Sequence, residues 1–361
     1  MKVGYLALQA PDISPCQRYR VEAFLPGLKR RGIEVSYDWV LSREDMRVFY
    51  GHSTFPRRVG LAARAALKRL RSVTLRRDVD VFFVQREAFF LLPEWSEWLA
   101  RLSAPIVFDF DDAIWIHTIS EGNRRLAFLK NVAKIPRIAR MAHTVLAGND
   151  FLATWARQYS NNVHVIPTVV DTDHFTPGPR SDSGPVTIGW SGSPTTFVHL
   201  RLLLPVLERI KARYGDRIRL RVMGDPNFHH APLDLRGEAW TAAAELAMLR
   251  EMEIGIMPLS DDIWTLGKCG LKGLVAMSMG AATVMSPVGV STEMVTHGEN
   301  GFLARSDDEW VEYLSRLIED VSLRRRIAAA GRDTVIERYS VAKWEEPLAA
   351  LLLRAGQPAN R

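Results

Sequence analysis

The stretch that decides the fold of this chain is KCGLKGLVAMSMGAATVMSPVGV, residues 268–290. Two lysines lead into a predicted helix of small residues, a glycine ends that helix, and a short apolar strand follows. A helix N-terminus that carries Lys268 and Lys272 combines backbone N–H groups, the positive end of the helix dipole and mobile cations. This combination favours binding of a phosphate or pyrophosphate. The alternative is an ordinary α/β packing unit, in which small residues allow close contact between helix and sheet.

The alternation of strands and helices extends toward the N-terminus. The predicted strands of the first half are residues 3–8, 34–40, 79–85, 105–110, 144–147 and 163–166. The predicted helices between them are residues 18–31, 57–71, 92–102, 124–142 and 149–158. Strands that alternate with helices indicate a parallel, doubly wound sheet, so the predicted fold class is α/β.

The stretch FTPGPRSDSGP at 175–185 is rich in Pro, Gly and Ser, which is typical of an interdomain linker. After it, strands are predicted at 186–190, 219–223, 254–258 and 282–285, and helices at 196–213, 241–252, 271–279, 307–319 and 323–338. We therefore expect two Rossmann-like domains that face a central cleft, where the carboxyl ends of the strands would meet a ligand. The predicted parts are 1–175, the linker 176–185, the second domain 186–341, and a last helix over 342–361 that packs back on the first domain.

Length and composition indicate a two-domain enzyme in a reducing compartment. The chain has 361 residues, of which 47% are hydrophobic and 24% charged. Cys16 and Cys269 lie far apart without metal-ligand spacing, so no disulfide framework is expected. The N-terminal MKVGYLAL is typical of a first β-strand and not of a signal peptide, and no apolar run has the length of a membrane span. We expect a cytoplasmic protein.

Residues 57–77 form a strongly basic segment. The formal net charge is +6, and this segment contains basic residues without any acid. They are Arg57, Arg58, Arg64, Lys68, Arg69, Arg71, Arg76 and Arg77. A basic amphipathic helix suits an anionic membrane surface and would allow peripheral association at the inner membrane face, or it suits an anionic acceptor; the alternative is a solvated helix face. Because no nucleic-acid-binding module is recognised, nucleic acid is not an expected partner.

Three segments resemble the motifs of a known family. They are IPTVVDTDHFTP at 166–177, VTIGWSGS at 186–193 and KGLVAMSMGAATVMSPVGVSTEMVTHGENGFL at 272–303. Together they resemble the retaining glycosyltransferases of family four, the glycosyl transferases group 1, most closely in the second half of the chain. The resemblance implies the GT-B fold, a nucleoside-diphosphate sugar as donor substrate, and no required cofactor or metal.

Two departures from the family pattern concern donor binding. A Glu-x7-Glu pair that contacts the donor sugar and the ribose would fall on Gly267 and Val275, and neither is acidic. In this the chain resembles an atypical Gly-Lys-Cys subgroup, with Glu293 as the favoured substitute carboxylate and Glu299 and Asp261 as alternatives. A basic pair expected after the first strand of the second domain is also absent. In its place stand Ser191, Ser193, Thr195 and Thr196.

The resemblance therefore implies a donor site built on the second domain. Its candidates are Gly192, Ser193, Thr195, Lys268, Lys272, Gly289, Val290 and Glu293. Lys268 is the candidate clamp for the departing diphosphate and is included among the catalytic candidates; a structural salt bridge is the alternative. Gly289 and Val290 would present backbone N–H groups, and the alternative is an ordinary turn.

The segment FDFDDAIW at 108–115 places carboxylates at the end of a predicted strand. In an extended strand Asp109 and Asp111 share one face and Asp112 lies on the other. Asp111 and Asp112 are the catalytic candidates, for orienting an acceptor or supporting the transition state; a helix N-cap is the alternative. The candidates for acceptor or phosphate binding are Arg18, Arg20 and Arg86.

The leading hypothesis is a retaining glycosyltransferase of the hexosyltransferase type (EC 2.4) that acts on a hydroxyl acceptor. The acceptor classes left open are a polysaccharide, as in polysaccharide biosynthesis, a glycolipid and a small molecule. A sugar-nucleotide epimerase on the same fold is one alternative. The other is a non-catalytic protein that binds a nucleotide sugar, which the absent glutamate pair supports.

Overall fold

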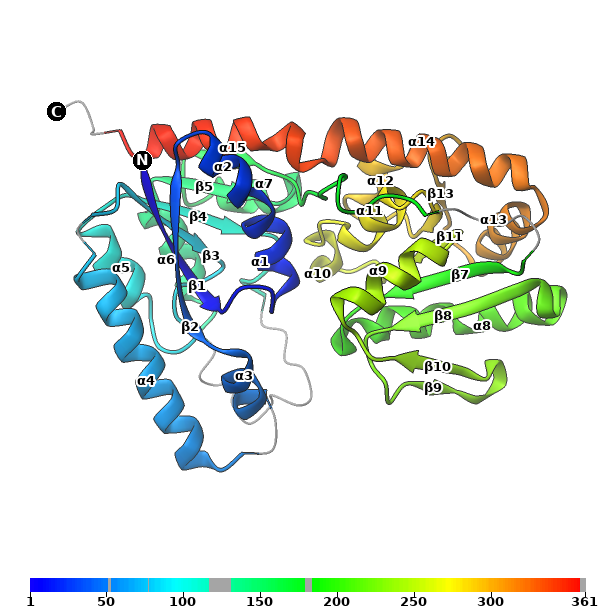
Figure 1. The fold of residues 1–361 in the computed structure, drawn as a ribbon, viewed down its shortest axis with the longest axis horizontal. Coiled ribbons are helices and arrows are strands. Elements are labelled where there is room, and N and C mark those ends of the chain that lie inside the picture. The colour runs from blue at the N-terminus through cyan, green and yellow to red at the C-terminus, as the bar shows by residue number, and fades with distance from the viewer. Residues whose placement is uncertain (51–52, 77, 117–130, 179–183, 358–361) are drawn as a thin grey trace. The chain divides into compact units, whose positions relative to one another are not determined.

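The computed structural model describes residues 1–50, 53–76, 78–116, 131–178 and 184–357. These residues form two compact units, each an α/β structure around one sheet (Figure 1). The first unit comprises Met1–Thr168 and Trp344–Arg361, and the second comprises Val169–Lys343. The predicted α/β class is confirmed.

The sheet of the first unit is parallel throughout, with the strand order β2-β1-β3-β4-β5-β6. Every residue of β3, β4 and β5 is buried, as expected for a parallel sheet that is covered by helices on both faces. The strands are β1 (Lys2–Gln9), β2 (Glu34–Leu41), β3 (Val81–Gln85), β4 (Ile106–Phe110), β5 (Thr144–Ala147) and β6 (Val163–Val165).

The helices of the first unit are α1 (Pro15–Arg20), α2 (Leu25–Arg30), α3 (Arg43–Tyr50), α4 (Phe55–Thr74), α5 (Trp95–Arg101), α6 (Lys134–Met141) and α7 (Asp150–Ala156). The single helix predicted over 18–31 is wrong, because a 3-10 turn at Glu22–Phe24 separates α1 from α2. Helix α3 was not predicted. Residues 124–130 of another predicted helix lie outside the described residues.

Helix α15 (Val341–Ala355) supplies the C-terminal part of the first unit. Its Glu345 carboxylate is nearly buried and forms ion pairs with Arg30 at 3.0 Å and Arg31 at 3.2 Å. Leu348 and Leu352 line a small apolar cavity against β1. These contacts attach the end of the chain to the sheet that contains its beginning.

The sheet of the second unit has the order β13-β12-β11-β7-β8-β10-β9 and is parallel except at β9. From β7 the chain builds toward β8 on one side and later toward β11 and β12 on the other, so the strand order reverses between β7 and β11. The strands are β7 (Val186–Ser191), β8 (Ile218–Met223), β9 (His229–His230), β10 (Leu235–Glu238), β11 (Ile254–Met257), β12 (Ala282–Met285) and β13 (Phe302–Leu303).

The helices of the second unit are α8 (Phe197–Tyr214), α9 (Ala242–Glu251), α10 (Ile263–Leu266), α11 (Leu271–Ser278), α12 (Ser291–Met294), α13 (Asp307–Glu319) and α14 (Val321–Tyr339). The apolar faces of α8 and α13 contribute to one core with the strands, which includes Leu207, Ile254 and Leu314. Side-chain caps begin several of these helices; Ser306 accepts a hydrogen bond from the Glu309 N–H at the start of α13.

The boundary predicted at residue 175 falls inside the second unit, which already begins at Val169. The Val170 N–H donates to the Tyr339 carbonyl at 2.9 Å, and the Arg332 guanidinium donates to the Phe175 carbonyl at 3.0 Å. Helix α14 therefore holds the segment that precedes the predicted linker. Residues 179–183 of that linker lie outside the described residues.

Candidate functional site

The second unit concentrates cationic and aromatic side chains at the carboxyl edge of its sheet. Gly192 follows β7 and Ser260 lies shortly after β11, the two strands between which the strand order reverses. Open α/β sheets bind ligands at this position, because the loops after adjacent strands diverge there. Helices α10 and α11 follow β11; of the two lysines that the sequence analysis selected, Lys272 lies in α11 and Lys268 in the link between the helices.

Each of these lysines lies against a tryptophan. The Lys272 ammonium is 4.5 Å from the centroid of the Trp190 ring, and the Lys268 ammonium is 4.8 Å from that of Trp264. Trp190 is only 1% exposed, so its ring presents a dry surface to Lys272. An ammonium at such a surface is less well hydrated than in bulk water and interacts more strongly with an anion.

His199, in the first turn of α8, belongs to the same cluster. Its burial and the charges of Lys272 and Lys268 lower the pKa of its imidazole to about 4. Its Nδ1 lies 3.5 Å from the Ser260 hydroxyl, which also donates to the Asp262 carboxylate at 2.6 Å. We call the three basic residues His199, Lys268 and Lys272 the basic cluster. An anion bound there would be met by two cations and one neutral imidazole.

Glycine turns pack closely around the basic cluster. A β-carbon on Gly224, whose φ is +132°, would lie 1.5 Å from the Gly192 carbonyl oxygen, so the turns after β7 and β8 require glycine. A β-carbon on Gly289, whose φ is +54°, would lie 3.1 Å from the carbonyl oxygen of Leu266. The Pro-Val-Gly turn therefore lies beside Leu266, which is the last residue of α10 and stands two residues before Lys268.

The remaining donor-site candidates are Ser193, Thr195, Val290 and Glu293, which lie outside the basic cluster. Ser193 and Thr195 are exposed, and their hydroxyls lie 3.0 Å apart. Val290 is buried and would contact a β-carbon placed on Gly270, the residue that begins α11. Glu293 is exposed on α12, and its role in donor binding remains a prediction.

The positions of the missing glutamate pair lie within this region. Gly267 ends α10, and the Val275 side chain is buried in α11 at 6% exposure. Asp262, the N-cap of α10, accepts from the Thr265 N–H at 2.9 Å and is linked to the basic cluster through Ser260. Asp261, the alternative named from the sequence, is exposed.

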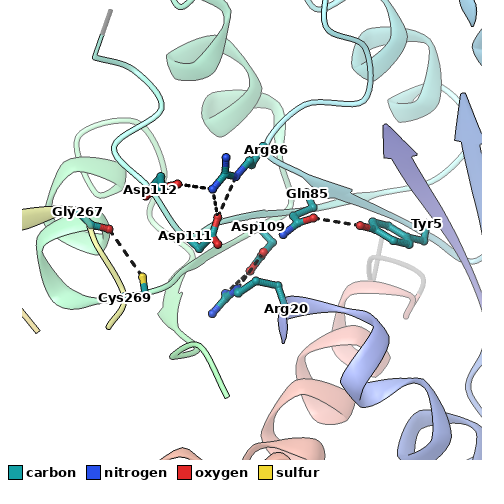
Figure 2. A network of polar contacts seen from close by, with 9 residues as sticks. All are labelled: Tyr5, Arg20, Gln85, Arg86, Asp109, Asp111, Asp112, Gly267 and Cys269. Carbon is teal, nitrogen blue, oxygen red and sulfur yellow. Dashed lines mark hydrogen bonds and ion pairs between the residues drawn. The ribbon is translucent and has the colours of Figure 1, made fainter. Parts of the chain in front are cut away.

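In the first unit, one arginine gathers the two catalytic candidates (Figure 2). Arg86 follows β3 and donates from Nε to Asp111 at 2.9 Å and from a terminal nitrogen to Asp112. Burial alone would raise the pKa of the Asp111 carboxyl, but the charges of Arg86 and Arg20 outweigh it and hold that pKa below its usual range. Asp111 is therefore ionised at neutral pH.

The predicted division of the carboxylates between strand faces is wrong. Strand β4 ends at Phe110, so Asp111 and Asp112 lie beyond the regular pleat and both reach Arg86. Asp109, still within β4, is buried and pairs with Arg20. Figure 2 shows these two arginine–aspartate groups side by side.

Arg20 is 2% exposed and also donates to the Ile166 carbonyl, so we now expect it to support the site without touching substrate. Arg18 is partly exposed, with its guanidinium carbon 5.5 Å from the Tyr19 ring centroid. The structure thus separates these two candidates, which the sequence treated alike. Arg18 remains a candidate for acceptor or phosphate binding.

The backbone around Arg86 is held by buried charges. Arg86 itself has φ of +62°, which is unfavourable for a residue with a side chain. Arg69 donates to the Ala88 carbonyl at 2.8 Å, and Lys134 donates to the Phe89 carbonyl at 2.6 Å. The Glu97 carboxylate accepts from the Ala88 N–H at 2.8 Å. These contacts fix the segment after β3 and so stabilise the conformation of Arg86.

Among the described residues, one group has side chains close enough to share a metal ion: Cys16, Asp111 and Asp112, whose ligand atoms lie within 4.8 Å of one another. Arg86 already neutralises both carboxylates. Burial raises the pKa of the Cys16 thiol well above its usual range, although the Arg86 charge lowers it, so the thiol is protonated at neutral pH when no metal is bound. Arg86 thus supplies the positive charge that a divalent cation would supply beside these carboxylates.

A family comparison finds a match within the second unit. Residues 185–320 match the family described as Glycosyl transferases group 1. The matched residues include β7, the basic cluster and the turns at Gly192, Gly224 and Gly289. A comparison with curated protein sequences finds no match.

Solved glycosyltransferase structures share the fold along the whole chain. The Anabaena protein Alr3699/HepE in complex with UDP has a TM-score of 0.66 at 16% identity, and the match covers 98% of this chain and 100% of that one. Sucrose-phosphate synthase from Thermosynechococcus elongatus has a TM-score of 0.70 at 12% identity, with 98% of each chain covered. A glycosyltransferase from Rickettsia africae ESF-5 has a TM-score of 0.69 at 13% identity, with 99% of each covered. The chain has the GT-B fold of two Rossmann-like domains.

The sequence analysis missed His199, Trp190 and Asp262 as site residues. One signal was available for His199: it lies in the first turn of the helix after β7, where a nucleotide-binding unit presents its ligand-facing residues. Nothing in the local pattern of Trp190 distinguishes it from a core residue. The sequence therefore located the basic cluster only through its lysines.

Proposed function

We propose that the protein is a glycosyltransferase that moves a sugar from a nucleoside-diphosphate sugar to a hydroxyl acceptor, with retention at the anomeric carbon. The observation that carries this proposal is the basic cluster at the strand-order reversal of a unit that matches the glycosyl transferases group 1. Its two ammonium groups suit a diphosphate. Because Alr3699/HepE was solved with UDP and with UDP-glucose, a uridine nucleotide is the first donor to test.

The proposed roles follow from the charges. Lys268 and Lys272 neutralise the negative charge that grows on the departing diphosphate, while the amides near Gly192 and Gly289 contact phosphate or sugar. Asp112 orients the acceptor hydroxyl or supports positive charge at the anomeric carbon, and its side chain is 15% exposed. Arg86 keeps that carboxylate in place.

An orphaned polar group near the basic cluster also supports a bound ligand. In the part of the chain that the structure describes, the indole N–H of Trp190 is buried without a hydrogen-bond acceptor. Such a group costs free energy unless a ligand or a water molecule satisfies it. Trp190 lies directly beneath the Lys272 ammonium at the candidate surface for donor recognition.

One observation favours a different function. Gly267 and Val275 supply no carboxylate where the family carries its glutamate pair, as expected for a protein that binds a nucleotide sugar without turning it over. A sugar-nucleotide epimerase on the same fold is the other alternative. The acceptor, whether polysaccharide, glycolipid or small molecule, belongs to this proposal as an open class.

A donor screen followed by a transfer assay tests the proposal. Unfolding temperatures are measured with UDP, GDP, dTDP, ADP and CMP sugars, since a specific ligand stabilises the folded state by mass action. The stabilising donor is then incubated with hydroxyl acceptors, and release of the nucleoside diphosphate is followed. We expect Asp112→Asn to bind the donor and to lose transfer. Asp78→Asn is the matched control, because Asp78 is 58% exposed and pairs with Lys2 before β3.

Each alternative gives a different outcome. Conversion of the donor sugar without acceptor, and without release of nucleoside diphosphate, would identify an epimerase. Donor binding with no turnover on any acceptor class would support the non-catalytic reading. No stabilisation by any nucleotide sugar would refute all three.

A further inference from the structure

Helix α4, which contains most of the basic segment 57–77, presents three different faces. Leu61, Ala65, Arg69 and Val73 are buried and attach the helix to the first unit. Arg69 is 0% exposed, so the prediction that it belongs to a basic surface is wrong; its guanidinium binds backbone carbonyls instead. Arg77 lies outside the described residues.

The second face is an exposed apolar stripe. Val59, Ala63, Leu67 and Leu70 recur at helical spacing on the side away from the buried face, and the three larger residues are 50%, 51% and 39% exposed. Phe55, at the start of the helix, is 71% exposed. Apolar side chains in such a row are uncommon on a solvent-facing helix, which usually carries polar residues there.

The neighbouring helix α5 and the residue after it also carry exposed apolar side chains. Helix α5 packs against α4, and Figure 1 shows both helices at the same edge of the first unit. Trp98 is 54% exposed and Leu102, just after α5, is 68% exposed. Tryptophan is the side chain most typical of the boundary between lipid and water. We call the exposed apolar residues of α4 and α5 the apolar edge.

The third face of α4 is a basic row beside this edge. Arg57, Arg64, Lys68 and Arg71 follow one another at helical spacing, and Phe55–Thr74 contains no acidic residue. Arg64 pairs with Asp45, and the Lys68 ammonium lies 3.1 Å from the centroid of the Trp39 ring. Arg57 and Arg71 are exposed.

We propose that the apolar edge and the basic row together form a docking surface for an anionic lipid membrane. The apolar side chains would enter the boundary between headgroups and acyl chains, and the basic side chains would meet the anionic headgroups. No helix in the described residues has the length and apolar composition to cross a bilayer, so this contact would be peripheral. The proposal uses a surface separate from the basic cluster and stands independently of the donor.

Charge favours a membrane over the other occupants of such a surface. A second copy of this chain, related by two-fold symmetry, would place the basic row against itself and bring like charges together. A nucleic acid would satisfy the arginines but would leave the leucines and Trp98 exposed to water. An anionic bilayer can bind both the basic row and the apolar edge, because it has negative charge at its surface and hydrocarbon directly below.

The test is co-sedimentation of the full chain with vesicles of phosphatidylcholine and phosphatidylglycerol, with pure phosphatidylcholine as the neutral reference. We expect binding to the anionic vesicles that falls as salt is added. Leu67→Gln/Leu70→Gln should weaken the partition by about tenfold, through loss of apolar transfer. Arg57→Gln/Arg71→Gln should weaken it by about tenfold on anionic vesicles and reduce its salt dependence. The matched control is Leu202→Gln, an equally exposed leucine on α8 at 53%.

A second measurement does not require removal of any apolar or basic side chain from the proposed surface. An environment-sensitive dye on Ala63→Cys, in a Cys16→Ser background, should become brighter with anionic vesicles and stay unchanged with neutral ones. The same dye on Leu202→Cys should not respond to either. Equal binding to both vesicle types, or partition unchanged in both double variants, would overturn the proposal. The proposal would also be overturned if the protein did not bind vesicles but formed a dimer, and if Leu67→Gln/Leu70→Gln converted that dimer to monomers.

Discussion

Replacing Lys272 with alanine should weaken nucleoside-diphosphate binding by one to two orders of magnitude. Lys272 extends from the first turn of α11, and its ammonium lies 4.5 Å from the Trp190 ring centroid. The ring is buried and cannot move away to let water surround the charge. The ammonium is therefore partly dehydrated before the ligand arrives, which reduces the cost of bringing a phosphate next to it.

The magnitude follows from this environment. Two unit charges about 4 Å apart attract by about 1 kcal/mol in bulk water and by about 4 kcal/mol at the effective dielectric constant near a protein surface. Desolvation of the phosphate removes part of the larger value, and a charge-assisted hydrogen bond nets about 1.5–3 kcal/mol. This free energy corresponds to roughly a 10- to 150-fold rise in the dissociation constant.

The assay is calorimetric titration of the nucleoside diphosphate into the wild type and Lys272→Ala. Lys272→Arg should keep most of the affinity, because the positive charge remains. Lys343→Ala is the matched control, since Lys343 is an exposed lysine of the same unit. The reasoning would be refuted if Lys272→Ala bound within twofold of the wild type, or if Lys343→Ala lost as much affinity.

Three further predictions concern other parts of the molecule. Arg86→Ala should lower the rate of sugar transfer by about 100-fold, because Asp111 and Asp112 lose the cation that holds them, and should leave the donor dissociation constant unchanged. Steady-state kinetics measures the rate, and calorimetry measures the dissociation constant. Arg69→Met should lower the free energy of unfolding by about 3 kcal/mol in urea titration, because three carbonyls lose their donor, two of them in buried hydrogen bonds. The pKa of His199 is about 4 in the folded protein and 6.5 in the unfolded chain, so the unfolded chain binds more protons between these two pH values. The free energy of unfolding should therefore decrease as the pH falls from 6.5 to 4. His199→Gln should remove this contribution of His199, which urea titrations at several pH values would measure.

Strand positions, and the places of the two lysines and the Pro-Val-Gly turn in the second unit, could be predicted from the sequence. Buried strands such as β4 and β12 are short, apolar and separated by helical periods, so local pattern is enough to locate them. Lys268, Lys272 and Gly289 were selected for the same reason, because a helix start and a glycine turn are read from adjacent residues. Helix α3 and the break between α1 and α2 were missed, since tertiary packing overrides propensity in segments this short.

The sequence by itself determined the α/β class, the two lysines at and just before the start of α11 and the basic character of residues 57–77. Only the tertiary structure decided what each charge does. Arg69 lies in the same basic segment as Arg57, and Arg20 lies two residues from Arg18. Yet Arg69 and Arg20 are buried, where they bind carbonyls and a carboxylate that are distant in the chain. His199 joins the basic cluster because α8 and α11 follow strands that are neighbours only in the folded sheet. The physical reason is that burial and electrostatic partners depend on long-range packing, whereas helix and strand periods are local properties of the chain.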